Sequence, residues 1–272
     1  MEPFTLQKES LHLSRWESVW PELTAGFSTR HHGISAGEYA SLNCGLHVGD
    51  RAEDVIENRR RLVESNGFLF SSWTCADQVH GNCVVQVTER EAGAGREALE
   101  DTITGTDGLV TDCRNIFLAA FYADCVPLFF YAPAHHVIGV AHAGWKGTAA
   151  NIAHNMVGEM KRIWGISASE IYAAIGPSIG PCCYEVNDVV ADKIKDILGE
   201  KAQSVLQPVK TDKYMLNLQE TNRILLLEAG ISNSRIELSQ LCTSCRTDLF
   251  FSHRKEAGKT GRMTAFIALK EG

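Results

Sequence analysis

The sequence predicts an α+β fold whose core is a mixed, largely antiparallel β-sheet with flanking helices. Three apolar, β-like runs follow one another closely, at Ile116–Phe121, Val126–Tyr131 and Val137–His142. The gaps of four or five residues between them are too short for a crossover helix, so neighbouring strands are expected to pair antiparallel. Apolar residues at helical spacing then predict a helix over residues 147–163.

The chain before these runs alternates short strands, loops and one helix. The helix is expected at about residues 51–66, where Asp50 is a plausible N-cap and Asn66-Gly67 ends the pattern. The charged, Ala/Gly-rich segment 89–104 has no periodicity and predicts an exposed loop. A short strand that runs into a glycine turn is expected within residues 24–33, a strand with a turn near Asp77 at 68–79, and further strands at 83–87 and 107–111.

The chain after these runs continues the same mixture. Helices are expected from the cap Asn187 to Leu198 and over 218–228, where Gly230 closes the second helix. Strands are expected at residues 171–175, 236–241 and 263–269. Neither an internal repeat nor a linker-like segment interrupts the pattern, so we expect a single domain over residues 1–272.

Composition excludes several classes of protein. Hydrophobic residues make up 44% of the 272 residues and charged residues 22%, as in ordinary globular domains. The net charge of −7 argues against a general nucleic-acid surface, which needs surplus Lys and Arg. No secretory signal and no apolar run of about 18 residues occurs, so no membrane span is expected. The nine cysteines, an odd number, are expected to be reduced thiols in a cytoplasmic protein.

Three residues are the leading candidates for chemistry. Cys125 follows Asp124 at a turn between two apolar runs, and His142 ends the third run. His80 lies upstream in the sequence DQVHG. One thiolate and two imidazoles suit Zn²⁺ and leave a fourth position open for water or substrate. No short zinc motif links the three residues, so a core thiol and two ordinary histidines remain the alternative.

Two arginines are candidates for binding an anion. Arg30 lies in STRHHG and Arg254 in FFSHRKEAGKTGR, both in loops that contain glycine. Either guanidinium can hold a phosphate by two parallel hydrogen bonds. The alternative is that both are ordinary surface arginines.

The remaining cysteines give weaker signals. Cys242 and Cys245 form a lone CxxC, which by itself is weak support for a structural zinc site. Cys182 and Cys183 are adjacent, so we do not expect them to chelate one ion together, and at least one is expected to point into the core.

Seven motifs, in order along the chain, together resemble the laccase-domain family, also called YlmD/YfiH-like or multicopper polyphenol oxidoreductase-like. They are STRHHG, SLNCGLHVGD, DQVHG, ADCVPLFFY, HAGWKGT, IGPSIGPCCYEV and FFSHRKEAGKTGR. The resemblance covers nearly the whole chain. It implies one α+β domain similar to the cytotoxic-necrotizing-factor/YfiH-like cysteine-hydrolase fold, and zinc bound by His80, Cys125 and His142.

The resemblance also implies an activity on purine nucleosides. The implied reactions are phosphorolysis of adenosine, inosine and methylthioadenosine, and deamination of adenosine. Phosphorolysis requires phosphate near C1′ of the ribose, for which Arg30 and Arg254 are the candidates. Deamination requires a carboxylate that moves protons, for which Asp124 and Glu185 are the candidates. The usual HxE and PCxxC signature of zinc deaminases is absent.

Three other functions stay open at this point. A copper-dependent polyphenol oxidase is possible because blue-copper centres also use two His and one Cys, although the chain has no His-x-His pair. A cysteine hydrolase would use Cys125 as nucleophile and His142 as base. The third alternative is a non-catalytic metal-binding module.

Overall fold

The computed structural model describes residues 2–271 and confirms the α+β class. Two six-stranded sheets and one three-stranded sheet form the framework. The first large sheet has the strand order β1 (Thr5–Gln7), β2 (Ser10–His12), β3 (Leu23–Ser28), β15 (Met263–Leu269), β7 (Phe117–Tyr122), β4 (Trp73–Cys75). The second has the order β14 (Ile236–Leu238), β10 (Tyr172–Ile175), β8 (Val126–Ala132), β9 (Val137–Ala143), β6 (Gly108–Thr111), β5 (Val84–Gln86).

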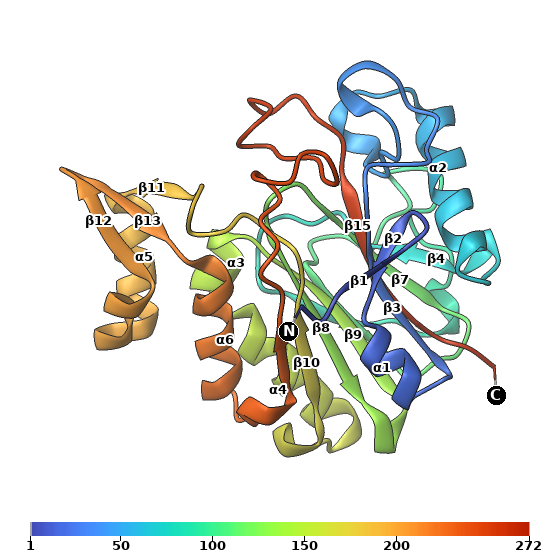
Figure 1. Cartoon of the computed structure of the whole chain (residues 1–272). Coiled ribbons are helices and arrows are strands. Elements are labelled where there is room, and N and C mark those ends of the chain that lie inside the picture. The colour runs from blue at the N-terminus through green and yellow to red at the C-terminus, as the bar shows by residue number, and fades with distance from the viewer. Residues whose placement is uncertain (1, 272) are drawn as a thin grey trace.

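Most strand pairs are antiparallel, as the short connections predict. The parallel pairs are β4–β7, β5–β6 and β10–β14. The small sheet has the order β11 (Glu185–Asn187), β13 (Lys213–Leu216), β12 (Leu206–Lys210). Together with helix α5 (Asp188–Leu198) it projects from the main body (Figure 1).

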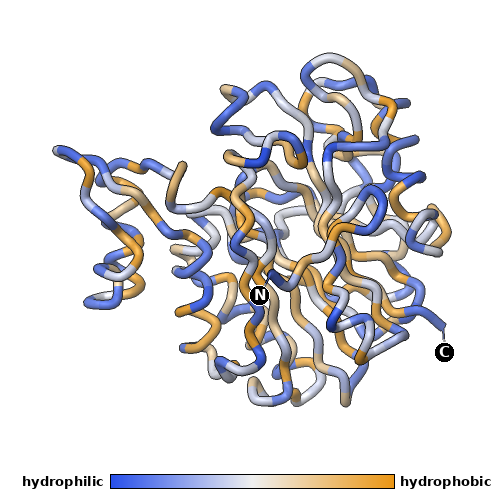
Figure 2. The backbone as a smooth tube through the Cα atoms, in the orientation of Figure 1, coloured by the Kyte–Doolittle hydropathy of each residue, from blue (hydrophilic) through white to orange (hydrophobic). Residues whose placement is uncertain are grey.

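The two large sheets pack face to face between layers of helix. Alternate residues of β7 point in opposite directions: Phe117 and Phe121 join the apolar cluster that includes α2 (Ala52–Ser65), whereas Leu118 and Tyr122 join the cluster between the sheets. On the far side, β8 and β9 pack against α4 (Ile152–Trp164) and α6 (Leu218–Glu228). Figure 2 shows the hydrophobic residues gathered along these central strands.

Two short helices complete the fold. Helix α1 (Ser14–Val19) packs near β3, and α3 (Trp145–Ala149) begins directly after β9. The single helix expected over 147–163 is therefore divided into α3 and α4. Asn151 divides them: its φ is +59°, and its side chain accepts the backbone N–H of His154 at 3.2 Å as the N-cap of α4. Within residues 2–271, every helix is too short or too polar to serve as a transmembrane span.

The expected antiparallel pairing is confirmed for β8 with β9 and wrong for β7 with β8. Strand β7 pairs with β15 and β4, whereas β8 pairs with β9 and β10. Both strands are buried on both faces, so their sequence contains no alternation that assigns them to a particular sheet. The chain passes from one sheet to the other through 123–125. This passage places Cys125 where the two sheets diverge.

Two further differences concern short strands. The short strand expected within 24–33 is β3, whereas the strand expected within 68–79 is confined to the three residues of β4, and the hairpin of β12 and β13 was not expected. Most residues of β12 are exposed, so the sequence has no apolar face there that would indicate a strand.

Candidate active site and metal centre

The structure brings His80, Cys125 and His142 together. One ligand atom from each of the three lies within 4.8 Å of the others. His142 is near the end of β9, Cys125 immediately precedes β8, and His80 lies in the turn after β4. The His80 and His142 rings meet edge to face with centroids 4.8 Å apart. This arrangement has the composition of a three-ligand metal site.

A buried carboxylate, Asp107, orients the histidines. Its Oδ1 lies 2.8 Å from His142 Nδ1 and accepts the backbone N–H of His80 at 3.0 Å. Its Oδ2 accepts the backbone N–H of Gly81 at 2.7 Å. With Nδ1 bonded to Asp107, the Nε2 atom of His142 is the one left for a ligand. From the sequence, Asp107 was expected only to begin a strand; an acidic residue at the start of an otherwise apolar strand is the signal that points to its role.

The backbone around the ligands is shaped to hold them close together. His80 and Asp124 adopt positive φ values of 61° and 87°, which non-glycine residues rarely do. A Cβ on Gly144 would lie 3.0 Å from Cys125 Sγ and 3.3 Å from His80 Cδ2. Glycine at this position therefore leaves room for the cluster and for an ion within it.

The electrostatics favour a thiolate. Burial would raise the pKa of Cys125, but the His142 and His80 imidazoles outweigh burial and lower that pKa to about 6. Burial would lower the pKa of His142, but Cys125 and Asp107 raise it to about 9. Burial also opposes ionisation of Asp107, yet hydrogen bonds from His142 and from backbone N–H groups lower its pKa. These opposite pKa shifts favour a thiolate beside an imidazolium in the metal-free protein, and a bound metal would replace the shared proton.

The three ligands border a cavity of about 420 Å³. This volume is in the range of small-molecule sites. Aromatic side chains from three different segments line it, namely Phe121, Trp145 and Tyr184. Two arginines, Arg254 and Arg262, supply positive charge at the same cavity. The remaining lining residues are His47, Asp77, Gln78, Ala123, Asp124, Ile179 and His253.

Asp124 lines this cavity, but its carboxylate is engaged. It accepts hydrogen bonds from Thr243 Oγ1 at 2.7 Å, from Ser252 Oγ at 3.0 Å and from the backbone N–H of Arg254 at 2.7 Å. These bonds tie three loops together beside Cys125. They favour a positioning role for Asp124, and its role as a proton carrier stays a prediction.

Comparison with known proteins identifies the family. Residues 24–270 match the family model described as multi-copper polyphenol oxidoreductase laccase. The chain belongs to this laccase family.

Similar members of the laccase family have names that refer to nucleosides. The chain is 47% identical over 247 residues to purine nucleoside phosphorylase YlmD of Geobacillus stearothermophilus, covering 91% of this chain and 90% of the relative. It is 44% identical over 273 residues to purine nucleoside phosphorylase YlmD of Bacillus subtilis, covering 99% and 98%. The crystal structure of YlmD from Geobacillus stearothermophilus superimposes with a TM-score of 0.96 at 44% identity over the whole of both chains.

In this laccase-family chain, the two arginines singled out from the sequence lie in different surroundings. Arg254 lines the cavity, with its guanidinium carbon 5.2 Å from the centre of the Tyr184 ring. Arg30 is not among the lining residues. Its guanidinium donates to the Ala40 carbonyl at 3.0 Å and to Glu256 at 3.0 Å, so it serves to join loops. Phosphate binding by Arg30 stays a prediction that the cavity does not support.

The laccase-family cavity also contains residues that the sequence analysis did not single out. Arg262 ends the motif FFSHRKEAGKTGR, and His47 lies within SLNCGLHVGD. Burial and the charge of Arg262 lower the pKa of His47 to about 4, so this imidazole is neutral near pH 7. Their membership of the quoted motifs was the available signal. Glu185 is not among the lining residues, and its carboxylate lies 3.6 Å from Lys210.

Proposed function

We propose that this protein is a zinc-dependent purine nucleoside phosphorylase. The observation that carries the proposal is a group of three metal-type ligands, His80, Cys125 and His142, at a cavity that also contains two arginines. The names of the YlmD relatives support the choice of nucleosides and phosphate as substrates. The cavity of about 420 Å³ can enclose a nucleoside, which an isolated metal-binding module would not require.

The ligand set fits zinc. Gly144 leaves space beside the Cys125 sulfur, and Asp107 holds His142 with one ring nitrogen free. A zinc ion held by His80, Cys125 and His142 would supply a Lewis acid and would lower the pKa of a bound water.

The other cavity residues suggest how substrates would be held. The Arg254 and Arg262 guanidinium groups would neutralise phosphate and orient it towards C1′ of the ribose. The aromatic side chains that line the cavity, Trp145, Phe121 and Tyr184, would contact the purine. Holding both substrates side by side in one cavity lowers the entropic part of the barrier, which is the main need of a phosphorolysis reaction.

Deamination of adenosine is the finer part of the proposal. It needs a group that transfers protons near C6 of the purine. The two carboxylates of the cavity, Asp77 and Asp124, both accept backbone N–H groups, at 3.0 Å from Gly105 to Asp77 and at 2.7 Å from Arg254 to Asp124. We therefore expect deamination to be slower than phosphorolysis.

The test is a product analysis with and without phosphate. Purified zinc-containing protein is incubated with adenosine, inosine or methylthioadenosine, and the free base and the sugar 1-phosphate (ribose 1-phosphate, or methylthioribose 1-phosphate from methylthioadenosine) are quantified by chromatography. Phosphorolysis predicts base release that requires phosphate, whereas deamination predicts inosine from adenosine in its absence. No product from any nucleoside, with metal occupancy confirmed, would reject the proposal.

The metal-ligand side chains support a multicopper oxidase less well than they support a zinc enzyme. Such an oxidase needs further imidazole-rich copper sites. Within residues 2–271, the second group of metal-type side chains contains four cysteines and no histidine. Metal analysis of a Cys182→Ser/Cys245→Ser variant, which lacks two of these four cysteines, separates the two functions when zinc and copper are supplied equally: the zinc proposal expects zinc at His80, Cys125 and His142.

A cysteine hydrolase is the second candidate, and one observation favours it. Cys125, His142 and Asp107 form a chain of thiol, imidazole and carboxylate in which the pKa of the thiol is lowered to about 6. This mechanism does not need His80. A His80→Ala variant that retains turnover would favour the hydrolase, whereas loss of both metal and turnover would favour the zinc enzyme.

A further inference from the structure

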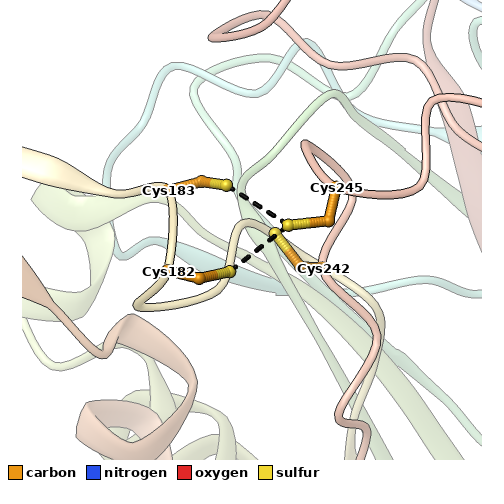
Figure 3. Close-up of side chains that lie close together, drawn as sticks. All are labelled: Cys182, Cys183, Cys242 and Cys245. Carbon is orange, nitrogen blue, oxygen red and sulfur yellow. Dashed lines mark hydrogen bonds between the residues drawn. The ribbon is translucent and has the colours of Figure 1, made fainter.

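Four cysteines from two distant segments converge outside the cavity. Cys182 and Cys183 come from the loop before β11, and Cys242 and Cys245 from the loop after β14. All four sulfur atoms lie within 4.8 Å of one another, and they point towards a common centre (Figure 3). The expectation that adjacent cysteines cannot share one ion is therefore not supported by their geometry. The expectation that one of the pair points into the core is wrong, because Cys182 is exposed and Cys183 half-buried, beside Cys245.

The sulfur spacing matches a mononuclear thiolate site. Cys245 Sγ lies 3.5 Å from Cys182 Sγ and 3.4 Å from Cys183 Sγ. A regular tetrahedron with zinc–sulfur bonds of about 2.3 Å has sulfur atoms about 3.8 Å apart. Little movement is needed to reach that geometry from the observed positions.

A disulfide explains the cluster less well. Cys182 and Cys183 approach the same sulfur atom, Cys245 Sγ, which can form a disulfide with only one of them. A single disulfide with Cys245 would also leave two thiols of the four unpaired, and the short sulfur–sulfur contacts of Cys182 and Cys183 both converge on Cys245. A metal ion, in contrast, uses all four.

The backbone provides the support that a thiolate needs. The N–H of Gly180 donates to Cys242 Sγ at 3.2 Å. A Cβ at Gly180 would lie 3.2 Å from Cys242 Cβ and 3.4 Å from Cys182 Sγ, so glycine permits the close approach of the two loops. Ser178 and Cys242 are also joined as a parallel β-bridge, which fixes the register of the loops.

We infer that Cys182, Cys183, Cys242 and Cys245 form a second metal site, a closed tetrathiolate site for zinc that is separate from the His80–Cys125–His142 group. Four protein ligands leave no position for substrate, so the role is structural. The site joins two distant segments of the chain: Cys245 lies 63 residues after Cys182 and 62 residues after Cys183.

This site would brace one wall of the cavity. Thr243, between the two CxxC cysteines, donates to Asp124 at 2.7 Å. The Cys183 carbonyl accepts from the Arg254 guanidinium at 3.4 Å, and Tyr184, the next residue, lines the cavity. Loss of the ion would release these contacts together.

Alkylation of the unmodified protein tests the inference with an internal control. Cys83 is exposed like Cys182 and Cys245 but belongs to neither metal-type group. Reduced protein saturated with zinc is treated with iodoacetamide, and each cysteine is followed by peptide mass mapping. We expect Cys83 to react fast and Cys182 and Cys245 at least about tenfold more slowly, until a strong chelator removes the protection.

Two outcomes of this experiment would overturn the inference. One is labelling of Cys182 and Cys245 at the rate of Cys83 before chelation. The other is protection that survives the chelator in the reduced protein, because the thiols are then shielded by something other than a bound ion.

A second measurement isolates this site from the proposed active site. The His80→Ala/His142→Ala variant lacks two ligands of the His80–Cys125–His142 group, called the first group below, and keeps the four cysteines of the second site. Titration of its reduced, metal-free form with Co²⁺ is expected to give the intense thiolate-to-cobalt charge-transfer absorption of a tetrathiolate, saturating at one ion per chain. Absence of that absorption would overturn the inference. Because this variant lacks the first site, the result does not depend on whether the protein is a phosphorylase.

Discussion

The two groups of metal-type side chains differ in what surrounds them. His80, Cys125 and His142 combine nitrogen and sulfur and border a cavity. The four-cysteine cluster is all sulfur and lies between two loops. Three ligands with an open side suit catalysis, and four ligands without one suit a structural role. Cysteine occurs in both, so the neighbours of a cysteine, and not its presence, indicate its role.

The hydrogen bonds that support the ligands also differ between the two groups. At the first group, the Asp107 carboxylate fixes the orientation of an imidazole. At the cluster, the Gly180 backbone N–H donates to a sulfur atom. A carboxylate increases the basicity of a histidine ligand, whereas an N–H donor stabilises a thiolate. Each support suits its own ligand type.

Removal of the Cys125 sulfur gives the largest expected effect. Cys125→Ser should lose the metal of the first group and reduce phosphorolysis by about 10³-fold, since a metal contributes several kcal/mol to the barrier. Cys113→Ser is the matched control, because Cys113 is also half-buried and packs against the same apolar cluster. Metal content and rate are measured for both. Equal losses in the two variants would contradict the proposed role.

Acidification should weaken metal binding at the first group. The pKa of His142 is raised to about 9, so between about pH 6 and 9 one proton must leave for the ion to bind. Below about pH 6 Cys125 is protonated as well, so a second proton must leave before the ion can bind. Zinc affinity should therefore fall about tenfold per pH unit from pH 8.5 to 6.5, or about 100-fold in total.

Competition with a zinc indicator measures this dependence. The Cys182→Ser/Cys245→Ser variant is used, so that the first group alone is titrated. An affinity that is constant over the same pH range would show that no proton is displaced, contrary to the imidazolium at His142.

Loss of the carboxylate that orients His142 is expected to have an intermediate effect. Asp107→Asn cannot accept from His142, His80 and Gly81 together, because one side-chain atom becomes a donor. Zinc affinity should fall about 10- to 100-fold. Asp112→Asn, an acidic residue near the end of the same strand, is the control and should bind zinc normally. Unchanged affinity in Asp107→Asn would show that His142 is held by other contacts.

The sequence predicts the positions of the strands better than it predicts which strands pair with one another. Continuous apolar runs reveal β7, β8 and β9, and the helices at 51–66, 187–198 and 218–228 agree with α2, α5 and α6. The assignment of β7 to a different sheet from β8 depends on β15, which is contributed by the end of the chain. Local spacing contains no information about so distant a partner.

The same limit applies to the candidate site. His80, Cys125 and His142 are identified by chemistry and by resemblance, and the structure brings them together. The four-cysteine cluster could not be recognised, because its halves are about sixty residues apart and a tight turn from Gly180 to Tyr184 presents adjacent sulfur atoms to one centre. Rules on the spacing of metal ligands in sequence apply to ligands within one loop and do not detect a site formed by two loops that are distant in the chain.

Substitution of Arg254 gives a smaller expected effect than the loss of Asp107 and links the two groups of metal-type side chains. Arg254 lines the cavity, and its guanidinium also donates to the Cys183 and Glu185 carbonyls. Arg254→Gln removes a charged hydrogen-bond donor, so the KM for phosphate should rise about tenfold while the KM for the nucleoside changes by less than about twofold. Arg246→Gln is the control, because Arg246 pairs with Asp248 at 2.8 Å and is not among the lining residues.

Measuring the KM for phosphate in variants of the cysteine cluster tests whether the cluster acts on the cavity through Arg254. If the tetrathiolate site positions Arg254 through the Cys183 carbonyl, then Cys182→Ser/Cys245→Ser should raise the KM for phosphate in the same direction as Arg254→Gln, but by less. Combining the substitutions should then add little to the effect of Arg254→Gln alone, because both act through one side chain. Fully additive effects would show that the cluster braces the cavity without acting through Arg254.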